Sequence, residues 1–457
     1  MEAAPALAGL THEVTELERQ TIARVARRLL PMLIVCYFIA FLDRVNVGFA
    51  SLTMNKALGF SSAVYGFGGG IFFLGYFIFE VPSNLLLSKV GARRWIARIL
   101  VTWGVISGCT ALISGPWSFY ALRFLLGVAE AGFFPGIVLY LTWWFPSYYR
   151  SRILGIFMVA IPLSSILGSL VSGVLLDLDG WLGIAGWQWL FVLEAAPAVV
   201  LGVVFWYTMT DWPSEAHWLT AEQRDWLTAR LASERSRRET VRHYSLGQAL
   251  TNRRVLMLSL AYFGGAFSGY GIALFQPQIV HRLAQGFGMT GVINAIPSVF
   301  AAAAMVWWGR HSDRTGERPR HVAFAYAVGA AGLIATSLMT DPVLTMTTLV
   351  IAAVGLSSTA PIFWSLPTAM LSGTAAAGGI ALINALGNLG GFFGPYAFGL
   401  IKDATGGSFT FGLMVIALGP IMSAAIILVL GHDRQLEHIP AGSPRPPATP
   451  GLTPTAD

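Results

Sequence analysis

The sequence contains few charged residues and almost no cysteine. Charged side chains make up 11% of the 457 residues, whereas an ordinary soluble protein has about 25%, so most of the chain must lie where charge is costly. The only two cysteines, Cys36 and Cys109, fall in apolar segments without metal-ligand spacing. Neither a disulfide framework nor a zinc site is indicated, and we expect no cofactor.

Catalytic signatures are missing as well. The sequence has no His-Glu-x-x-His motif, no serine nucleophile elbow and no paired aspartates within an apolar segment, which argues against a membrane enzyme. A receptor would need a signalling domain, but the only polar segments are a short central linker and a proline-rich tail. The net charge of +6 comes from basic residues in short loops, where topology explains them without nucleic acid.

Long apolar runs dominate what is present. Repeated runs of 18 or more apolar residues between short polar breaks are typical of transmembrane helices. We therefore expect an all-α membrane protein with twelve such helices in two six-helix halves. The predicted helices span 29–50, 63–88, 95–115, 117–145, 153–175 and 187–209, then 255–280, 290–311, 322–340, 343–365, 376–401 and 408–431.

The polar segments define the predicted domains. Residues 1–28 form a cytoplasmic segment without a signal peptide, and 29–210 and 255–431 form the two bundles. Between them, residues 211–254 form a linker in which Trp218, Leu219, Trp226, Leu227 and Leu231 recur at helical spacing, which predicts an amphipathic helix on the membrane face. The tail, 432–457, has too few apolar residues to order itself.

Basic residues predict the orientation. Lys and Arg in short loops stay on the cytoplasmic side. With the amino terminus inside, 24 of the 29 basic residues lie on the cytoplasmic side, while Lys56, Arg282 and Lys402 lie outside and Arg44 and Arg123 lie within helices. We therefore predict a multi-pass protein of the inner (plasma) membrane with both termini in the cytoplasm, working as a monomer.

The two halves also resemble each other. Residues 88–94 follow the second predicted helix and 312–318 follow the eighth, and both are basic turns that contain a glycine, Gly91 and Gly316. Such an internal repeat is typical of a duplicated transporter that binds its substrate between the halves near the membrane midplane.

Several motifs are similar to those of a known family. The pattern Gly-x-x-x-Asp-Arg-x-Gly-x-Arg at 309–318 resembles the signature of the major facilitator superfamily. The segments 41–50, 79–84, 127–136, 186–191 and 378–388 resemble its anion:cation symporters, and most closely the permeases for 4-hydroxyphenylacetate, tartrate and phthalate. The resemblance covers residues 29 to 431. It implies the major facilitator fold and proton-coupled uptake of a small organic carboxylate; an anion exchanger or an efflux carrier of the same fold is the alternative.

Charged residues inside predicted helices are the first functional candidates, because each costs about 3 kcal/mol at the membrane centre. Asp43 and Arg44 are neighbours in the first helix and point about 100° apart, so each faces a different partner. The planar guanidinium of Arg44 forms a fork of N–H donors that can bind both oxygens of a carboxylate, which predicts that Arg44 binds the substrate. The resemblance implies that Asp43 handles protons. A structural ion pair is the alternative for both.

Glu130 on the fourth helix is the second predicted proton carrier. Expected to be buried without a cation, it would favour its neutral form and load a proton from outside. A protonated structural glutamate is the alternative. Arg123 is expected near the outer end of this helix, where it could reach the interface or serve as a gating charge; a structural role is favoured. Glu80 and Glu194 are expected to have structural or gating roles.

The remaining candidates come largely from the second half. Asn384 and Asn388 lie four residues apart on a glycine-rich face that can approach a ligand closely; the resemblance places a substrate-binding asparagine in this stretch, and an interhelical hydrogen bond is the alternative. Phe41 replaces a tyrosine of sugar-acid carriers, which favours a less hydroxylated or aromatic acid. Three further residues are predicted to line the wall of the substrate cavity: Tyr76, Gln276 and Trp364. Three charged residues at a cytoplasmic helix end are predicted to act in gating: Arg310, Asp313 and Arg314.

Overall fold

The computed structural model describes residues 15–239, 252–370 and 374–431. These residues are mostly helical and contain no strand. Eleven helical segments among them are long and apolar enough to cross a membrane. The predicted helix over 376–401 is present as α17 and α18, two consecutive helices of 15 residues each, which together make the twelfth crossing.

The first half and the linker contain nine α-helices within the described residues. They are α1 (Glu16–Leu58), α2 (Ser62–Val90), α3 (Ala92–Cys109), α4 (Pro116–Glu130), α5 (Phe133–Trp144), α6 (Ser147–Met158), α7 (Ala160–Leu176), α8 (Gly186–Thr208) and α9 (Ala221–Glu239), with short 3-10 turns at Thr110–Leu112, Trp181–Gly183 and Pro213–Glu215.

The second half is also built from helices joined by short connections. Its described helices are α11 (Arg253–His281), α12 (Phe287–Thr315), α13 (Pro319–Leu338), α14 (Pro342–Ser358), α15 (Ala360–Phe363), α16 (Ser365–Met370), α17 (Thr374–Asn388), α18 (Gly390–Ala404) and α19 (Phe409–Leu430). The predicted tail, 432–457, lies outside the described residues, as do residues 1–14 of the predicted cytoplasmic segment.

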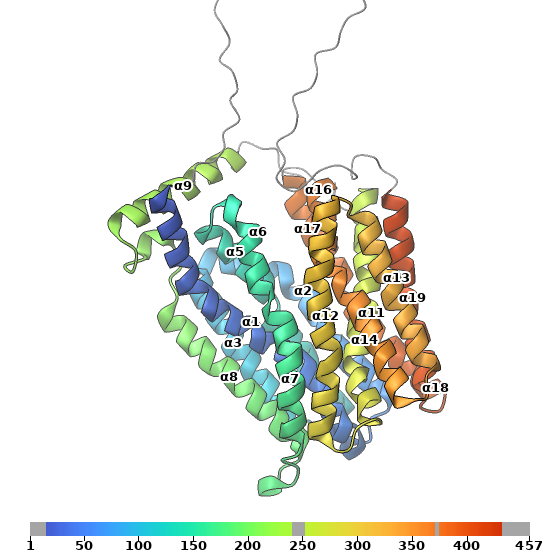
Figure 1. The fold of residues 1–457 in the computed structure, drawn as a ribbon. Helices are drawn as coiled ribbons and strands as arrows, with labels where there is room; N and C mark the ends of the chain where they lie inside the picture. The colour runs from blue at the N-terminus through green and yellow to red at the C-terminus, as the bar shows by residue number, and fades with distance from the viewer. Residues whose placement is uncertain (1–14, 240–251, 371–373, 432–457) are drawn as a thin grey trace, which may run out of the picture.

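Helix α9 marks one end of the bundle, which we call the linker end; the opposite end is the distal end (Figure 1). The first helix starts well before its predicted residue 29 and reaches out to α9. Its polar first turns carry Ile22, Val25 and Leu29 on one face, and all three are buried. Leu227 of α9 is fully buried in the same cluster. The amphipathic face of the linker helix therefore packs on the first half of the protein.

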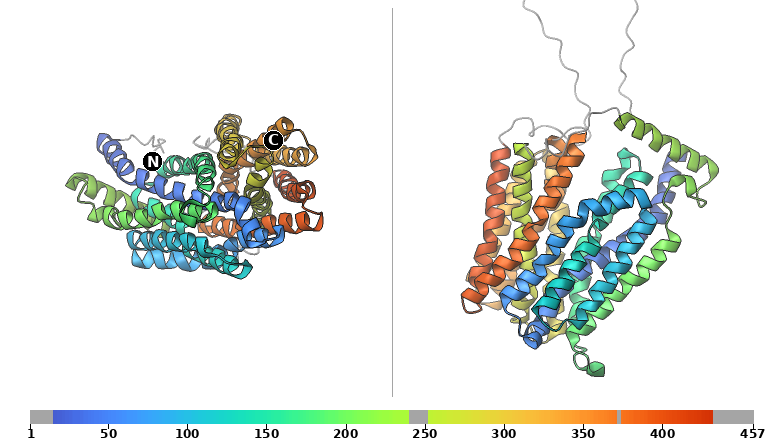
Figure 2. Two further views of the ribbon diagram at one scale, coloured as in Figure 1. Left: turned by 90° about the horizontal axis from the view of Figure 1, so that it is seen from below. Right: turned by 180° about the vertical axis from the view of Figure 1, so that it is seen from behind.

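The two halves meet through α2 and α18, α7 and α12, and α1 and α11 (Figures 1 and 2). The helices approach closely at glycines: a Cβ on Gly70 would lie 2.6 Å from the Phe392 carbonyl oxygen. At the distal end, Asp403 of α18 accepts hydrogen bonds from the backbone N–H groups of Ser62 (2.9 Å) and Ala63 (2.7 Å) at the start of α2.

The predicted repeat is visible in the backbone. Gly91 directly follows α2 and Gly316 directly follows α12, and both have positive φ values, +96° and +70°. Such a conformation favours glycine because it has no Cβ. The matching glycines thus end corresponding helices of the two halves at the linker end.

The predicted helix 117–145 is interrupted close to Glu130, one of the candidate site residues. The segment 117–145 divides into α4 and α5 because Gly132 adopts a φ of +85°. A Cβ there would lie 2.4 Å from the Ser83 hydroxyl oxygen, so a larger residue would also clash. The break makes Glu130 the last residue of α4.

Candidate functional site

Asp43 and Arg44 lie well inside α1 and face different neighbours, as their 100° separation predicts. Asp43 is 2% exposed, and its Oδ1 accepts hydrogen bonds from Asn46 Nδ2 (2.9 Å) and Ser107 Oγ (3.0 Å). Arg44 points to the break after α4 and binds Glu130. Asp43 and Arg44 are adjacent in the sequence, but they therefore interact with different residues.

Arg44 and Glu130 form a buried ion pair. Arg44 Nε donates to Glu130 Oε1 at 3.0 Å, and Nη2 donates to the same oxygen. The glutamate side chain is 1% exposed and that of the arginine 17%. The expectation of a carboxylate without a cation is wrong, because the break at Gly132 places Glu130 opposite α1. The second oxygen, Oε2, is buried without a hydrogen-bond partner among the described residues.

Aromatic rings surround the Arg44 guanidinium. Its carbon lies 5.0 Å from the centre of the Phe41 ring and 5.7 Å from the centres of the Phe72 and Tyr76 rings. Such cation-π contacts favour the charged group in a site with little water. Of the predicted wall residues, Tyr76 lies here, on α2, and it is 4% exposed.

Tyr37 also lines this site, and its place here was not predicted from the sequence. Its ring packs edge-on against Phe41 at 5.0 Å and stacks on Phe157 at 4.4 Å. It lies four residues before Phe41 and seven before Arg44, which places all three on one face of α1. That spacing was the available signal.

Asn384 makes a hydrogen bond between the two halves. Its Nδ2 donates to Glu80 Oε1 at 3.0 Å. Glu80, for which a structural or gating role was expected, therefore faces a predicted substrate residue across the interface. Asn388, one turn further along α17, is partly buried and makes no side-chain hydrogen bond with the described residues.

The glycines near Asn388 do not serve a ligand in this structure. A Cβ on Gly390 would lie 2.3 Å from the Phe263 carbonyl oxygen, and one on Gly394 would lie 1.9 Å from that of Phe267. This part of the glycine-rich face packs on the α11 backbone, because two helices can approach so closely only where Cβ atoms are missing.

The other predicted wall residues contact side chains of the second half. Gln276 of α11 donates to Asn294 Oδ1 of α12 at 3.1 Å, and Asn294 Nδ2 donates to Ser169 Oγ of α7 at 3.0 Å. Gln276 thus belongs to the contact between α7 and α12. Trp364 follows α15 and packs edge-on against Tyr262 at 5.1 Å.

The predicted gating residues lie at the linker end. Arg310, Asp313 and Arg314 are all exposed at the end of α12. Asp313 Oδ1 binds Arg318 Nη1 at 2.6 Å, so this ion pair stays within the second half. A lock between the halves remains a prediction for another conformation.

Arg123 does not reach the interface. It is 3% exposed, and its Nη2 donates to the Gly69 carbonyl oxygen at 3.3 Å while the guanidinium lies over the Phe72 ring at 5.2 Å. The expected reach of this side chain to the interface is therefore wrong, because the α2 backbone at Gly69 and the Phe72 ring hold the guanidinium inside the bundle.

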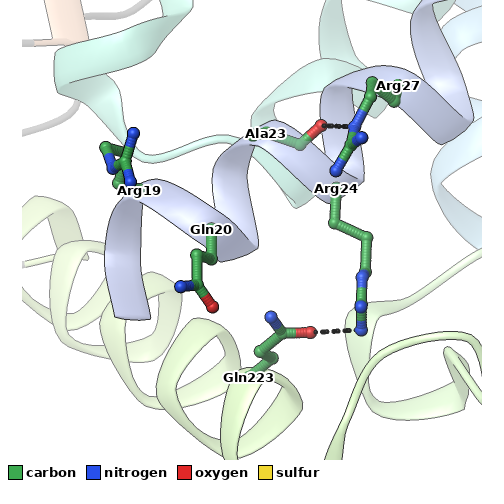
Figure 3. Close-up of a pocket in the computed structure, with 6 residues that line it drawn as sticks. All are labelled: Arg19, Gln20, Ala23, Arg24, Arg27 and Gln223. Atoms are coloured by element: carbon green, nitrogen blue, oxygen red, sulfur yellow. Dashed lines mark hydrogen bonds between the residues drawn. The ribbon is translucent and has the colours of Figure 1, made fainter. Parts of the chain in front are cut away.

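A pocket at the linker end is separate from these residues. It lies between α1 and α9, where Arg24 Nη1 donates to Gln223 Oε1 at 2.9 Å (Figure 3). None of the predicted proton or substrate residues lines it. Its lining residues are Arg19, Gln20, Ala23, Arg24, Arg27 and Gln223.

Comparisons with known proteins identify a family. The model of the Major Facilitator Superfamily matches residues 33–395. The chain is 52% identical to a "Putative tartrate transporter" of Agrobacterium vitis over 92% of this chain and 93% of the relative. It is 42% identical to a "Quinolone resistance transporter" of Acinetobacter baumannii over 86% of this chain and 90% of the relative. A bacterial homologue of the human lysosomal transporter Spinster, solved in an inward-facing and unoccupied conformation, has the same fold, with a TM-score of 0.75 and 17% identity over 91% of this chain and 99% of that one.

Proposed function

Because the chain belongs to the Major Facilitator Superfamily, and is therefore a multi-pass membrane transporter and not an enzyme, we propose that it takes up a small organic carboxylate together with protons. The ion pair between Arg44 and Glu130 carries this proposal. It joins a cation suited to a carboxylate with a group that can bind a proton, and it connects the interior of α1 to the last residue of α4.

The pair makes substrate and proton binding depend on each other. While Glu130 is charged it occupies the Arg44 fork, and a substrate carboxylate must compete with it. Removing one partner of a buried ion pair costs about 3–5 kcal/mol, because the other charge is left unpaired. A proton on Glu130 and a carboxylate on Arg44 together avoid that cost. Neither alone does, which is the thermodynamic basis of coupling.

The direction follows from the predicted orientation. If the linker end faces the cytoplasm, the contacts at Asp403 and Gly70 close the path to the outside, and the conformation is inward-facing. Rocking of one half against the other then opens the distal end. Asn384 changes partner in this step, because a helix of the second half cannot keep its bond to Glu80 while the halves rotate.

The substrate class rests on the site and on the relatives. A relative named for tartrate supports a small carboxylate. Of the three rings around Arg44, those of Phe41 and Phe72 carry no hydroxyl group and only that of Tyr76 does, which favours an acid with fewer hydroxyl groups or an aromatic acid such as 4-hydroxyphenylacetate or phthalate.

Uptake by purified protein in liposomes tests the proposal. Radiolabelled 4-hydroxyphenylacetate, phthalate and tartrate are offered with and without an inward proton gradient. We expect one of them to accumulate against its gradient and an uncoupler to abolish the accumulation. Exchange that is independent of the gradient would contradict proton coupling.

A matched pair of variants tests the role of Glu130. Glu130→Gln should lose proton-driven accumulation at least tenfold but retain exchange of labelled for unlabelled substrate, since an amide cannot carry the proton. Glu222→Gln, at an exposed position of α9, is the control and should behave like the wild type. Loss of exchange together with accumulation would assign Glu130 a role in binding instead.

Efflux is the second candidate, because one relative is named for quinolone resistance. The direction in which protons move during substrate entry distinguishes uptake by symport from efflux by antiport. Symport acidifies the liposome lumen as substrate enters, whereas a proton antiporter makes the lumen more alkaline during substrate entry. A pH-sensitive dye trapped in the lumen distinguishes these outcomes.

A further inference from the structure

Glu194 is a buried carboxyl group that the proposed transport cycle does not yet use. It lies on α8 and is 2% exposed. Ser172 of α7 donates a hydrogen bond to its Oε1 at 2.7 Å. Its second oxygen, Oε2, is fully buried and has no hydrogen-bond partner among the described residues. A carboxylate oxygen in that position carries charge that nothing compensates.

Asn46 connects Glu194 to Asp43. The Asn46 amide nitrogen donates to Asp43 Oδ1 at 2.9 Å, and the same side chain interacts with Glu194. Asp43 repeats the arrangement of Glu194: a serine hydroxyl, that of Ser107, donates to one oxygen, and the other oxygen, Oδ2, is buried without a partner. Two carboxyl groups thus lie on either side of one amide.

Among the described residues, the two carboxyl groups are bound by hydroxyl and amide groups and not by a cation. Within the described residues, neither Asp43 nor Glu194 forms an ion pair. Arg44 is bound to Glu130. Arg123 of α4 interacts with Asp43 electrostatically, but its Nη2 donates a hydrogen bond to the Gly69 carbonyl oxygen. Glu130, which is negative, also acts on Asp43 and disfavours a second anion.

Two ionised carboxylates cannot share such a site at low cost. Like charges that interact across one side chain and are shielded from water disfavour double ionisation, so the pair retains a proton. We propose that Asp43 and Glu194, bridged by Asn46, form one proton-binding pair, and that Glu194 carries a proton in the transport cycle. The inference rests on the proposed function for its role in coupling.

The packing fits a proton site that moves as a unit. The pair is built from α1, α7 and α8, which contact one another within the first half. Rocking between halves leaves these contacts in place, so the proton site is separate from the interface where Asn384 and Glu80 meet. The Arg44 and Glu130 pair then selects the anion, while Asp43 and Glu194 hold an additional proton.

The number of protons moved per substrate tests the inference. In liposomes it is obtained from the membrane potential at which an imposed substrate gradient produces no net flux. We expect Glu194→Gln to move one proton fewer per substrate than the wild type while substrate exchange continues. Glu194→Asp retains the carboxyl group and should restore the wild-type number, and Glu222→Gln should not change it. An unchanged number in Glu194→Gln, with exchange intact, overturns the inference.

Infrared spectroscopy keeps the inference testable if Glu194→Gln does not assemble. A protonated carboxyl group has a characteristic C=O absorption, and its frequency should shift in Glu194→Asp. The absence of any such absorption that responds to this variant contradicts the proposed pair. If the wild type moves no protons with any carboxylate, the proposed symport fails, while the infrared measurement still decides whether the pair holds a proton.

Discussion

The contact between Asp403 and the start of α2 should set the balance between the two orientations of the carrier. The carboxylate belongs to the second half, and the two N–H groups it binds belong to the first. These bonds exist only while the distal end is closed, because opening that end separates α2 from α18. Asp403→Ala should therefore shift the population towards the distal-open conformation.

The size of the shift follows from the bonds that are lost. A hydrogen bond to a charged group contributes about 1.5–3 kcal/mol when well shielded, and a carboxylate at a helix N-terminus adds about 0.3–1 kcal/mol. Asp403 is exposed, so we use the lower end and expect about 1.5 kcal/mol. That corresponds to roughly a tenfold change in the ratio of distal-open to distal-closed molecules.

Distance measurements between spin labels test this shift. Labels on cysteines at Ala57 and Met289, both exposed at the distal end, report the separation of α1 and α12. The longer distance should gain weight in Asp403→Ala. Asp341→Ala is the matched control: Asp341 binds the N–H of Leu344 at the start of α14, within one half, at 2.9 Å. Equal distance distributions in Asp403→Ala and the wild type would refute the reasoning.

Two further predictions concern stability. Leu227→Ala should lower the free energy of unfolding by about 2–5 kcal/mol, because this α9 side chain is fully buried; thermal unfolding in detergent checks it, with the exposed Leu256→Ala as control. Gly127→Val should prevent α2 and α4 from packing, since a Cβ there would lie 2.0 Å from the Phe72 carbonyl oxygen. Yield of monodisperse protein measures this, and Gly155→Ala, where no atom lies within 4 Å, should match the wild type.

The sequence was sufficient for the helices because their signal is local. Each apolar run is long enough to cross a membrane by its own composition, and the ends of α2 and α12 carry matching glycines. The start of α1 was predicted too late, because residues 16–28 are too polar for a membrane segment. Their apolar side chains pack on a soluble helix instead, and that partner is distant in sequence.

The sequence indicated which residues belong to the site, but it did not indicate which of them interact with each other. Buried charge is costly wherever it occurs, which is why Asp43, Arg44 and Glu130 are conspicuous in an apolar sequence. Whether Glu130 faces a cation depends on a backbone break at Gly132 and on the rotation of α4 against α1. Gln276 shows the same limitation, since its position on α11 indicated a cavity and its actual partner, Asn294, is on α12.

The pairing changes how coupling should be understood. A lone carboxylate that loads and releases a proton would need a separate device to sense the substrate. A carboxylate that shares its arginine with the substrate needs none, because protonating Glu130 and filling the Arg44 fork are two halves of one exchange. Burial keeps that exchange strict, since Glu130 is 1% exposed and water cannot readily take the place of either partner. In the proposed function, the electrostatics of this one ion pair are therefore enough to couple the binding of the anion to the protonation of Glu130.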